Sequence, residues 1–516
     1  MLARGLLLVL IATSPAFAAR RYSSGGSIKL VAYDAKGRPM DLPKLLAFIG
    51  RADRKDGDDP GIAVTAPDGM GWAKPRLEQT GSIVTLEWVE LPRIILSLPW
   101  PVEDDGFSTV AVDREGRGFQ DGDVVYLNEE IALSEYRLFK EAWLKHTKDM
   151  DPPYEPGAKA KKLAEEAKDD LAQAQASKEG AKRSESFDKA LHAISLAWEK
   201  MLFEHGLELA RNDRTKNTLR LGLTLDDSLL ERLDHYQWII ETVKHSGANW
   251  VRLVFRPNPS DFTYAKLSSF NEYDEIVKEL RAAGIRVMGC VLDTNQWPSE
   301  LTPQVYAART RNLVLHYSDP IKSWEVVVEI NGNWLGGQKE PLSSQQVFKI
   351  FQAAAAQVKE IEPSLEVVGT LYWWDGTAPD EEHSLGGWLA MYVPKGFGRS
   401  VDVVALSLQP EDNPVGLGFE PIFERVRQYL PDKKVMLGSF GYVEKSDLNG
   451  YWWLNPTDVD GARKDLMILY TMASCAIPRS ACGGFWWQTL DQMIPAKHKT
   501  TDLFRVYRRT TQQIGR

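Results

Sequence analysis

The stretch Trp324-Glu325-Val326-Val327-Val328-Glu329-Ile330-Asn331 decides how this sequence folds. It predicts a short apolar strand that ends in a carboxylate, and the loop Gly332-Asn333-Trp334 follows it. A glutamate at the carboxyl end of a strand, beside a tryptophan, suits chemistry on a sugar, because the carboxyl group transfers a proton and the indole stacks on a ring. The neighbouring segments show which kind of sheet contains this strand.

Apolar strands and amphipathic helices alternate eight times between residues 217 and 516. This alternation predicts parallel strands with crossover helices, and eight such units in about 300 residues fit an α/β fold with a closed (β/α)8 TIM barrel. An open doubly wound sheet is the alternative, but the first strand lacks a glycine-rich phosphate loop. The predicted strands are 220–225, 250–255, 286–292, 323–329, 366–371, 401–408, 434–440 and 483–489.

Three segments precede the barrel. Residues 1–18 combine Arg4, an apolar run and an Ala16-Phe17-Ala18 ending, which predicts a signal peptide cleaved after Ala18 and a secreted or periplasmic protein. Residues 26–131 predict a small β-sandwich-like domain, and residues 132–212 predict a helical segment. The apolar run is too short to cross a bilayer, which needs about 20 residues.

Composition narrows the classes of partner. The chain has 43% hydrophobic and 26% charged residues, with a net charge of −9. This balance predicts a large core and argues against nucleic acid or an anionic membrane as the main partner. The eight histidines lack metal-ligand spacing, so neither a metal nor another cofactor is predicted. Cys475 and Cys482 either form a disulfide or stay reduced, whereas Cys290 is expected to be a buried thiol.

The predicted strand ends carry polar and aromatic side chains. The carboxyl ends of barrel strands form the active face in this architecture, and twelve of the 17 tryptophans lie in the barrel part. Indole faces stack on sugar rings, while carboxylates and amides bind hydroxyl groups, so we expect a polysaccharide or oligosaccharide cleft. The candidate binding residues are Arg252, Asp293, Trp297, Asn331, Trp334, Trp373, Trp374, Asp375, Gln409, Trp486, Trp487 and Asp491.

On these residues the barrel part resembles the superfamily of retaining β-glycosidases and endoglycanases that includes xylanases, cellulases and β-xylosidases. Its strand-four pattern Trp-Glu-Val-x-Asn-Glu matches residues 324–329, except that Val328 replaces the asparagine. Val251-Arg252-Leu253 matches strand two, and Trp487 to Asp491 match strand eight. The resemblance implies that Glu329 is the general acid/base.

The chain departs from this resemblance at strand seven, where the family carries its nucleophilic glutamate. The sequence there is Leu437-Gly438-Ser439-Phe440-Gly441, so Ser439 occupies the nucleophile position. A neutral hydroxyl without an activating base is a poor nucleophile at an anomeric carbon. Other carboxylates could supply the second group, with Glu444 preferred for a catalytic role; the further candidates are Glu411, Asp375 and Asp491.

Three functions remain open at this point. The first is a glycoside hydrolase that uses Glu329 as general acid/base, and the second is an inactive barrel that binds an envelope or extracellular polysaccharide. The third is a different enzyme on the same barrel, since fold does not fix function. We expect Arg252, Glu329 and Trp487 to meet at one mouth of the barrel, unless Glu329 only forms an ion pair with Arg252 or Arg256.

Overall fold

The structure, a computed structural model, describes residues 25–34, 36–50, 61–69, 71–81, 83–102, 106–178, 181–212, 218–256, 270–298, 301–337, 341–376, 378–410, 413–442 and 459–514. The predicted signal peptide at residues 1–18 lies outside this part of the chain, as do Glu411 and Glu444. None of the helices in the described ranges is long and apolar enough to cross a membrane.

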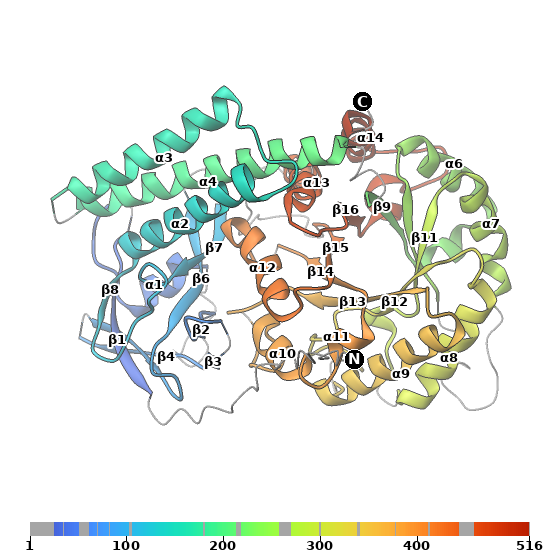
Figure 1. Cartoon of the computed structure of the whole chain (residues 1–516), viewed down its shortest axis with the longest axis horizontal. Coiled ribbons are helices and arrows are strands. Elements are labelled where there is room, and N and C mark those ends of the chain that lie inside the picture. Colours follow the sequence, from blue (N-terminus) through green and yellow to red (C-terminus); the bar gives the residue numbers. More distant parts are fainter. Residues whose placement is uncertain are drawn as a thin grey trace, which may run out of the picture.

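Eight parallel strands close into a barrel, which confirms the predicted (β/α)8 architecture and rules out the open sheet (Figure 1). The last strand pairs with the first, with Gly483 opposite Arg220. In chain order the strands are β9 (Arg220–Leu225), β10 (Trp250–Val254), β11 (Arg286–Cys290), β12 (Ser323–Val327), β13 (Glu366–Tyr372), β14 (Val403–Leu408), β15 (Lys434–Phe440) and β16 (Gly483–Trp486).

The strands are mostly apolar because helices cover their outer faces and side chains fill the interior. The filling includes Trp250, Met288, Met436 and Phe485, all of them buried. Two of the surrounding helices start with a side-chain cap from Thr302 or Ser343. The main helices are α6 (Tyr236–Ser246), α7 (Asp274–Ala282), α8 (Pro303–Tyr317), α9 (Ser344–Ile361), α10 (Leu385–Tyr392), α11 (Phe397–Ser400), α12 (Phe419–Tyr429), α13 (Val459–Ala476) and α14 (Asp502–Ile514).

The part before the barrel contains two four-stranded sheets, with strand orders β4-β5-β1-β8 and β3-β2-β6-β7. A short helix, α1 (Leu42–Phe48), accompanies them, and its Asp41 cap accepts a hydrogen bond from the Lys44 amide. The strands are β1 (Gly26–Val31), β2 (Ala63–Thr65), β3 (Trp72–Ala73), β4 (Arg76–Thr80), β5 (Ile83–Trp88), β6 (Ile95–Val102), β7 (Gly106–Val112) and β8 (Val124–Tyr126).

A helical segment follows without a break, since α2 (Leu127–Leu144) begins directly after β8 and continues into the helical turn η1 (Lys145–Asp149). Helices α3 (Ala158–Ala176) and α4 (Ala181–Arg211) then form a hairpin whose second arm reaches the barrel helix α13 (Figure 1). At Gly206 the approach is so close that a Cβ atom would lie 1.9 Å from the Met472 carbonyl oxygen. The long helix is therefore docked on the barrel.

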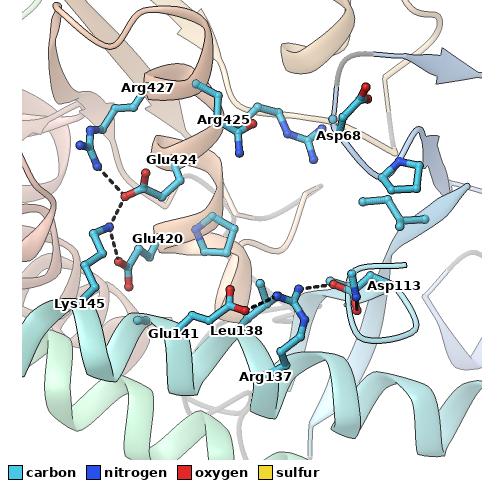
Figure 2. Close-up of a pocket in the computed structure, with 18 of the residues that line it drawn as sticks. Asp68, Asp113, Arg137, Leu138, Glu141, Lys145, Glu420, Glu424, Arg425 and Arg427 are labelled. Atoms are coloured by element: carbon cyan, nitrogen blue, oxygen red, sulfur yellow. Dashed lines mark hydrogen bonds and ion pairs between the residues drawn. The ribbon is translucent and has the colours of Figure 1, made fainter. Parts of the chain in front are cut away.

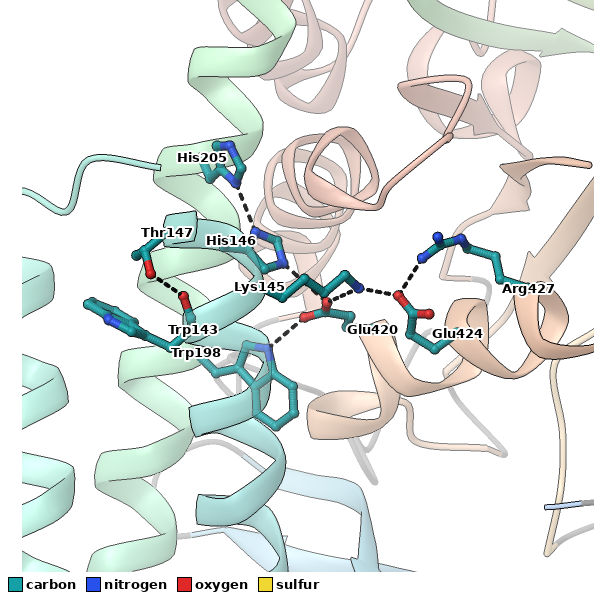
Figure 3. A network of polar contacts seen from close by, with 9 residues as sticks. All are labelled: Trp143, Lys145, His146, Thr147, Trp198, His205, Glu420, Glu424 and Arg427. Atoms are coloured by element: carbon teal, nitrogen blue, oxygen red, sulfur yellow. Dashed lines mark hydrogen bonds and ion pairs between the residues drawn. The ribbon is translucent and has the colours of Figure 1, made fainter. Parts of the chain in front are cut away.

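Buried polar contacts join the helical segment to α12. His146 Nε2 lies 3.1 Å from Glu420 Oε1, and the Trp198 indole donates to the other oxygen of Glu420 at 3.1 Å (Figure 3). Lys145 pairs with Glu420 at 3.1 Å. Because Glu420 is only 3% exposed, these partners replace the water that a charged group would otherwise need.

Cys475 and Cys482 form a disulfide, which decides the alternative that the sequence left open. Cys290 is a buried free thiol, as expected.

Candidate functional site

Glu329 lies two residues beyond the end of β12, at the carboxyl-end mouth of the barrel. Its backbone is left-handed, with φ of 50°, a conformation that non-glycine residues adopt mostly where the surrounding structure enforces it. The carboxylate accepts hydrogen bonds from Ser407 Oγ at 2.7 Å and from Trp334 Nε1 at 3.1 Å. These contacts fix the position of both carboxylate oxygens.

The pKa of Glu329 rises from 4.5 to about 7. Burial is the main cause, and the negative charge of Asp293 adds to it. The hydrogen bonds from Ser407 and Trp334 and the charge of Arg252 act in the opposite direction without overcoming burial. A carboxyl group with this pKa holds a proton near neutral pH and can still release it, which is the requirement for a general acid.

Arg252 occupies the interior of the barrel beneath this mouth. It is fully buried, its Nε donates to Glu325 Oε2 at 2.6 Å, and its Nη2 lies 3.7 Å from Asp293 Oδ2. Its guanidinium lies over the Trp487 ring at 5.0 Å from the centroid. Thr370 donates to the second oxygen of Glu325. The structure thus places Arg252, Asp293 and Trp487 together.

The ion-pair alternative for Glu329 is not observed. Arg252 pairs with Glu325 and Asp293, while Arg256 pairs with Glu231 at 2.9 Å. Within the part of the chain that the structure describes, the direct partners of the Glu329 carboxylate are a hydroxyl and an indole. Its proton is therefore free to transfer without breaking an ion pair.

Ser439 lies near the carboxyl end of β15, at the position where the resemblance implied a nucleophile. It is buried, and it pairs in register with Ser407 on β14 and Phe485 on β16. The β14–β15 register shifts between Leu406 and Ser407, and this irregularity sets Ser407 beside Ser439. The two serines put hydroxyl groups, rather than a carboxylate, on this side of the mouth.

Aromatic side chains form a cluster around Trp334. The ring of Trp334 lies 5.4 Å from Tyr372 and 5.2 Å from Trp374, measured between centroids. Trp334 is partly exposed, whereas Trp374 is almost buried. Asn331 braces this cluster, because its amide donates to the Tyr372 and His383 carbonyls at 2.9 and 2.8 Å.

Gln409 follows β14 and Trp487 follows β16, and both lie next to Gly441. A Cβ atom at Gly441 would be in ordinary van der Waals contact, 3.7 Å from Gln409 Oε1 and 3.4 Å from Trp487 Cβ, so both residues approach this position. Both side chains are partly exposed. They are therefore placed to contact a ligand at the mouth.

Five of the predicted binding residues make packing contacts or ion pairs. Trp297 is buried against Tyr306 at 5.1 Å, and Trp486 is buried with its indole donating to Gln492 at 3.2 Å. Trp373 is buried as well, beside Asp375, which pairs with Arg425 of α12 at 3.0 Å. Asp491 pairs with Arg232 at 2.9 Å on the surface. The contacts of these side chains are therefore core packing, one exposed ion pair of Asp491 and one largely buried ion pair of Asp375.

Two residues of the site were missed by the sequence reasoning. Ser407 stands out as the hydroxyl residue in the apolar strand Val-Val-Ala-Leu-Ser-Leu, and this contrast was an available signal. Glu325 gave a similar signal, because it is a charged residue within the apolar strand β12. It proves to be the partner of Arg252. A charged side chain inside a buried strand requires such a partner.

Comparisons with known proteins bear on the fold alone. No family model matches the chain, and no curated protein matches it. Among solved structures, the β-glucosidase from Thermotoga maritima aligns at 11% identity with a TM-score of 0.42, over 57% of this chain and 98% of that one. A structure of fungal β-1,4-galactanases aligns at 14% identity and a TM-score of 0.41, over 56% and 99%.

A third solved structure, a calcium-binding mutant of β-glucuronidase 2 from Bacteroides uniformis, aligns at 14% identity and a TM-score of 0.35. The alignment covers 49% of this chain but only 28% of that protein. Each of these TM-scores is below 0.5, and the eight-stranded parallel barrel rests on the strand pairing of this chain itself. Groups of three or more potential metal ligands are absent from the described residues.

Proposed function

We propose that this protein is an exported glycoside hydrolase that cleaves bonds in a polysaccharide or oligosaccharide, with Glu329 as the general acid. The observation that carries the proposal is the pKa of Glu329, which burial raises to about 7 at a mouth that also presents Trp334 and Trp487. A proton donor beside partly exposed indoles matches what glycosidic bond cleavage requires.

The contacts of Glu329 explain how it would act as an acid. In its protonated form it gives the proton to the glycosidic oxygen as the bond to the anomeric carbon breaks. The negative charge that then forms on Glu329 is stabilised at once by the hydrogen bonds from Ser407 and Trp334. The donors are in place before the reaction, so no reorganisation is needed.

Asp293 is the carboxylate that we assign as the partner of Glu329. It follows β11, is only 5% exposed, and lies 3.7 Å from the Arg252 guanidinium. Its charge already acts on Glu329. In the proposed reaction a water molecule attacks the anomeric carbon, Asp293 accepts the water proton, and Glu329 supplies the proton of the leaving alcohol.

This assignment replaces the other second carboxylates proposed from sequence. Asp375 and Asp491 are held in ion pairs with Arg425 and Arg232. Glu411 and Glu444 lie outside the described residues, and a role for Glu444 stays a prediction. Ser439 leaves the usual nucleophile position without a carboxylate, so we expect direct displacement by water and inversion at the anomeric carbon.

The second candidate function is a polysaccharide-binding barrel without catalysis. The observation that favours it is the pair of hydroxyl side chains, Ser407 and Ser439, on the strand ends opposite Glu329. Such a barrel would keep the aromatic contacts and lose only the bond cleavage.

One experiment separates the two functions. Purified protein is incubated with soluble β-glycans and aryl β-glycosides, and new reducing ends and their anomeric form are followed by NMR. Release with inversion, lost in both Glu329→Gln and Asp293→Asn, supports the hydrolase. Calorimetric binding of the same glycans without release supports the binding protein. A trapped covalent glycosyl intermediate would contradict the water mechanism.

A further inference from the structure

A second cavity lies outside the barrel, between the N-terminal sheets, helix α2 and barrel helix α12 (Figure 2). Its volume is about 610 Å3, within the range of about 300–1,000 Å3 that is typical of small-molecule sites. None of the mouth residues Glu329, Asp293 and Trp334 lines it. Ligand sites often form where separate parts of a chain meet, and three parts meet here.

The walls of this cavity are charged side chains that hold one another. Arg137 pairs with Glu141 at 2.7 Å and also with Asp113. Across the space, Lys145 pairs with Glu424, which also receives Arg427 at 2.6 Å. Figure 2 shows these side chains arranged around the open space. Because each cation already has a carboxylate partner, the walls are largely neutralised and their geometry is fixed.

The same side chains keep unused hydrogen-bonding capacity. Lys145 has three N–H donors and uses two of them, on Glu420 and Glu424. Glu141 accepts the hydrogen bond from Arg137 at its Oε1 atom. Glu424 accepts those from Lys145 and Arg427 at its own Oε1 atom. The second oxygen of each carboxylate can accept further bonds. Donors and acceptors therefore alternate around the cavity.

Part of the remaining lining is apolar, while Asp68, Arg425 and Gln428 add further polar side chains. Ile95 comes from β6, Leu138 and Ala142 come from α2, and Pro421 comes from α12. An apolar surface between polar walls suits a ring that has one apolar face and hydroxyl groups at its edge. A purely apolar ligand would leave the paired charges without solvent, at a cost in free energy.

We propose that this cavity is a second saccharide-binding site that takes a neutral, polyhydroxylated ring. An anionic ligand would have to displace a carboxylate from Arg137, Lys145 or Arg427, and a cationic ligand would have to displace one of these cations. Hydroxyl groups both donate and accept, so they bond to the walls without breaking an ion pair. The site holds a glycan outside the barrel, and it does not depend on hydrolysis at Glu329.

The test is calorimetric binding of neutral oligosaccharides, namely gluco-, xylo- and manno-oligosaccharides, to the full chain carrying Glu329→Gln. Leu138→Trp fills the cavity and should weaken binding of at least one of them by about tenfold or more, since each tenfold change corresponds to about 1.4 kcal/mol. Leu144→Trp is the matched control, because Leu144 lies on the same helix, is 48% exposed and does not line the cavity. It should bind like the parent.

Glu141→Gln gives a second, milder test, because Glu141 is 63% exposed and its loss leaves the fold intact. It should weaken binding several-fold through one altered hydrogen-bonding side chain. Thermal unfolding checks that Leu138→Trp stays folded. The proposal is overturned if none of the neutral sugars binds, if Leu138→Trp and Leu144→Trp bind alike, or if charged oligogalacturonate binds more tightly. None of these outcomes depends on whether the barrel hydrolyses a glycan.

Discussion

Ser407 Oγ donates a hydrogen bond of 2.7 Å to Glu329 Oε1, and this bond joins β14 to the residue that follows β12. It stabilises the ionised form of Glu329, whereas burial stabilises the protonated form. The pKa of about 7 is the balance of the two effects. The pKa of Glu329 should therefore change when either effect is altered. Ser407 is a positioning residue, and its role can be measured through this pKa.

Ser407→Ala should raise the pKa of Glu329 further, because a donor to the carboxylate is lost while burial remains. A hydrogen bond to a charged group is worth about 1.5–3 kcal/mol, so the basic limb of the kcat/KM profile should move up by about one to two pH units. Ser407→Thr keeps the hydroxyl and should leave the limb in place. A profile that falls without moving would show that Ser407 has only a structural role.

Glu329→Gln should reduce hydrolysis by about 100-fold or more, the usual contribution of general acid catalysis. Asp491→Asn is the control, since Asp491 is an exposed carboxylate at the end of the last barrel strand, held by Arg232. It should keep its activity. Initial rates on an aryl glycoside with a poor leaving group measure the effect, and equal rates in the two variants would remove Glu329 from the mechanism.

Glu329→Gln should also change how stability depends on pH. The unfolded carboxyl ionises near 4.5 and the folded one near 7, so the unfolded state loses its proton first as the pH rises. Glu329 therefore lowers the stability of the wild type across this window, by at most about 3 kcal/mol above it. Thermal unfolding should show that the variant gains stability relative to the wild type at pH 8 but not at pH 4. A constant difference would refute the raised pKa.

The barrel could be predicted from sequence because each of its strands is buried on both faces. Such strands are continuous apolar runs between amphipathic helices, and the pattern needs no knowledge of distant contacts. Segments such as 220–225 and 434–440 were predicted with their observed bounds. In the N-terminal sheets, β2 and β3 are only three and two residues long. They are too short to show an alternation of apolar and polar residues.

The site was harder to predict because its geometry depends on register and bulges. The prediction of Glu329 as an acid needed only its place at a strand end and the strand-four motif of residues 324–329. Ser407 reaches Glu329 because of a register shift between Leu406 and Ser407, which no local pattern reveals. Asp375 was expected at the mouth but forms an ion pair with Arg425, because the loop after β13 runs toward α12.

Trp334 and Trp297 should respond differently to the same substitution. Trp334→Phe removes the N–H that lies 3.1 Å from Glu329 but keeps an aromatic ring at the mouth, so kcat should fall more than ligand affinity. Trp297→Phe should lower stability by about 1–3 kcal/mol and leave the kinetics unchanged, since Trp297 is buried against Tyr306. Steady-state kinetics and chemical denaturation measure the two effects, and equal kinetic losses would contradict the assignment.

Arg252→Met should be strongly destabilising, by about 3–5 kcal/mol, because it leaves Glu325 buried without its cation. Adding Glu325→Gln should recover part of this loss, since the second change removes the uncompensated charge. The free energies of unfolding of the wild type, both single variants and the double variant form the cycle that measures this coupling. Strict additivity would mean that the two side chains do not interact.

The contact between the helical segment and barrel helix α12 should weaken at acidic pH, because His205 and Glu420 titrate differently in the folded and unfolded states. His205 Nε2 lies 3.2 Å from the Pro152 carbonyl oxygen, so it donates there, and Nδ1 faces His146 Nδ1 at 2.8 Å (Figure 3). Burial and the charge of His146 lower the pKa of His205 to about 4. Burial opposes the ionisation of Glu420, but His146 and Lys145 outweigh it and hold the pKa of Glu420 below its usual range.

The lowered pKa values of His205 and Glu420 both make the folded protein less stable as the pH falls. As the pH falls from about 6.5, His205 binds a proton in the unfolded state, whereas in the folded state it stays neutral until about pH 4. Glu420 likewise binds a proton at a higher pH in the unfolded state than in the folded state. Stability should therefore fall over this window. His205→Gln keeps a donor and an acceptor without a titrating ring, so it should lose less stability between pH 7 and pH 4.5 than the wild type. The exposed His245→Gln is the control, and limited proteolysis of α4 together with thermal unfolding measures the loss. Parallel pH dependence in all three proteins would show that His205 does not sense acid.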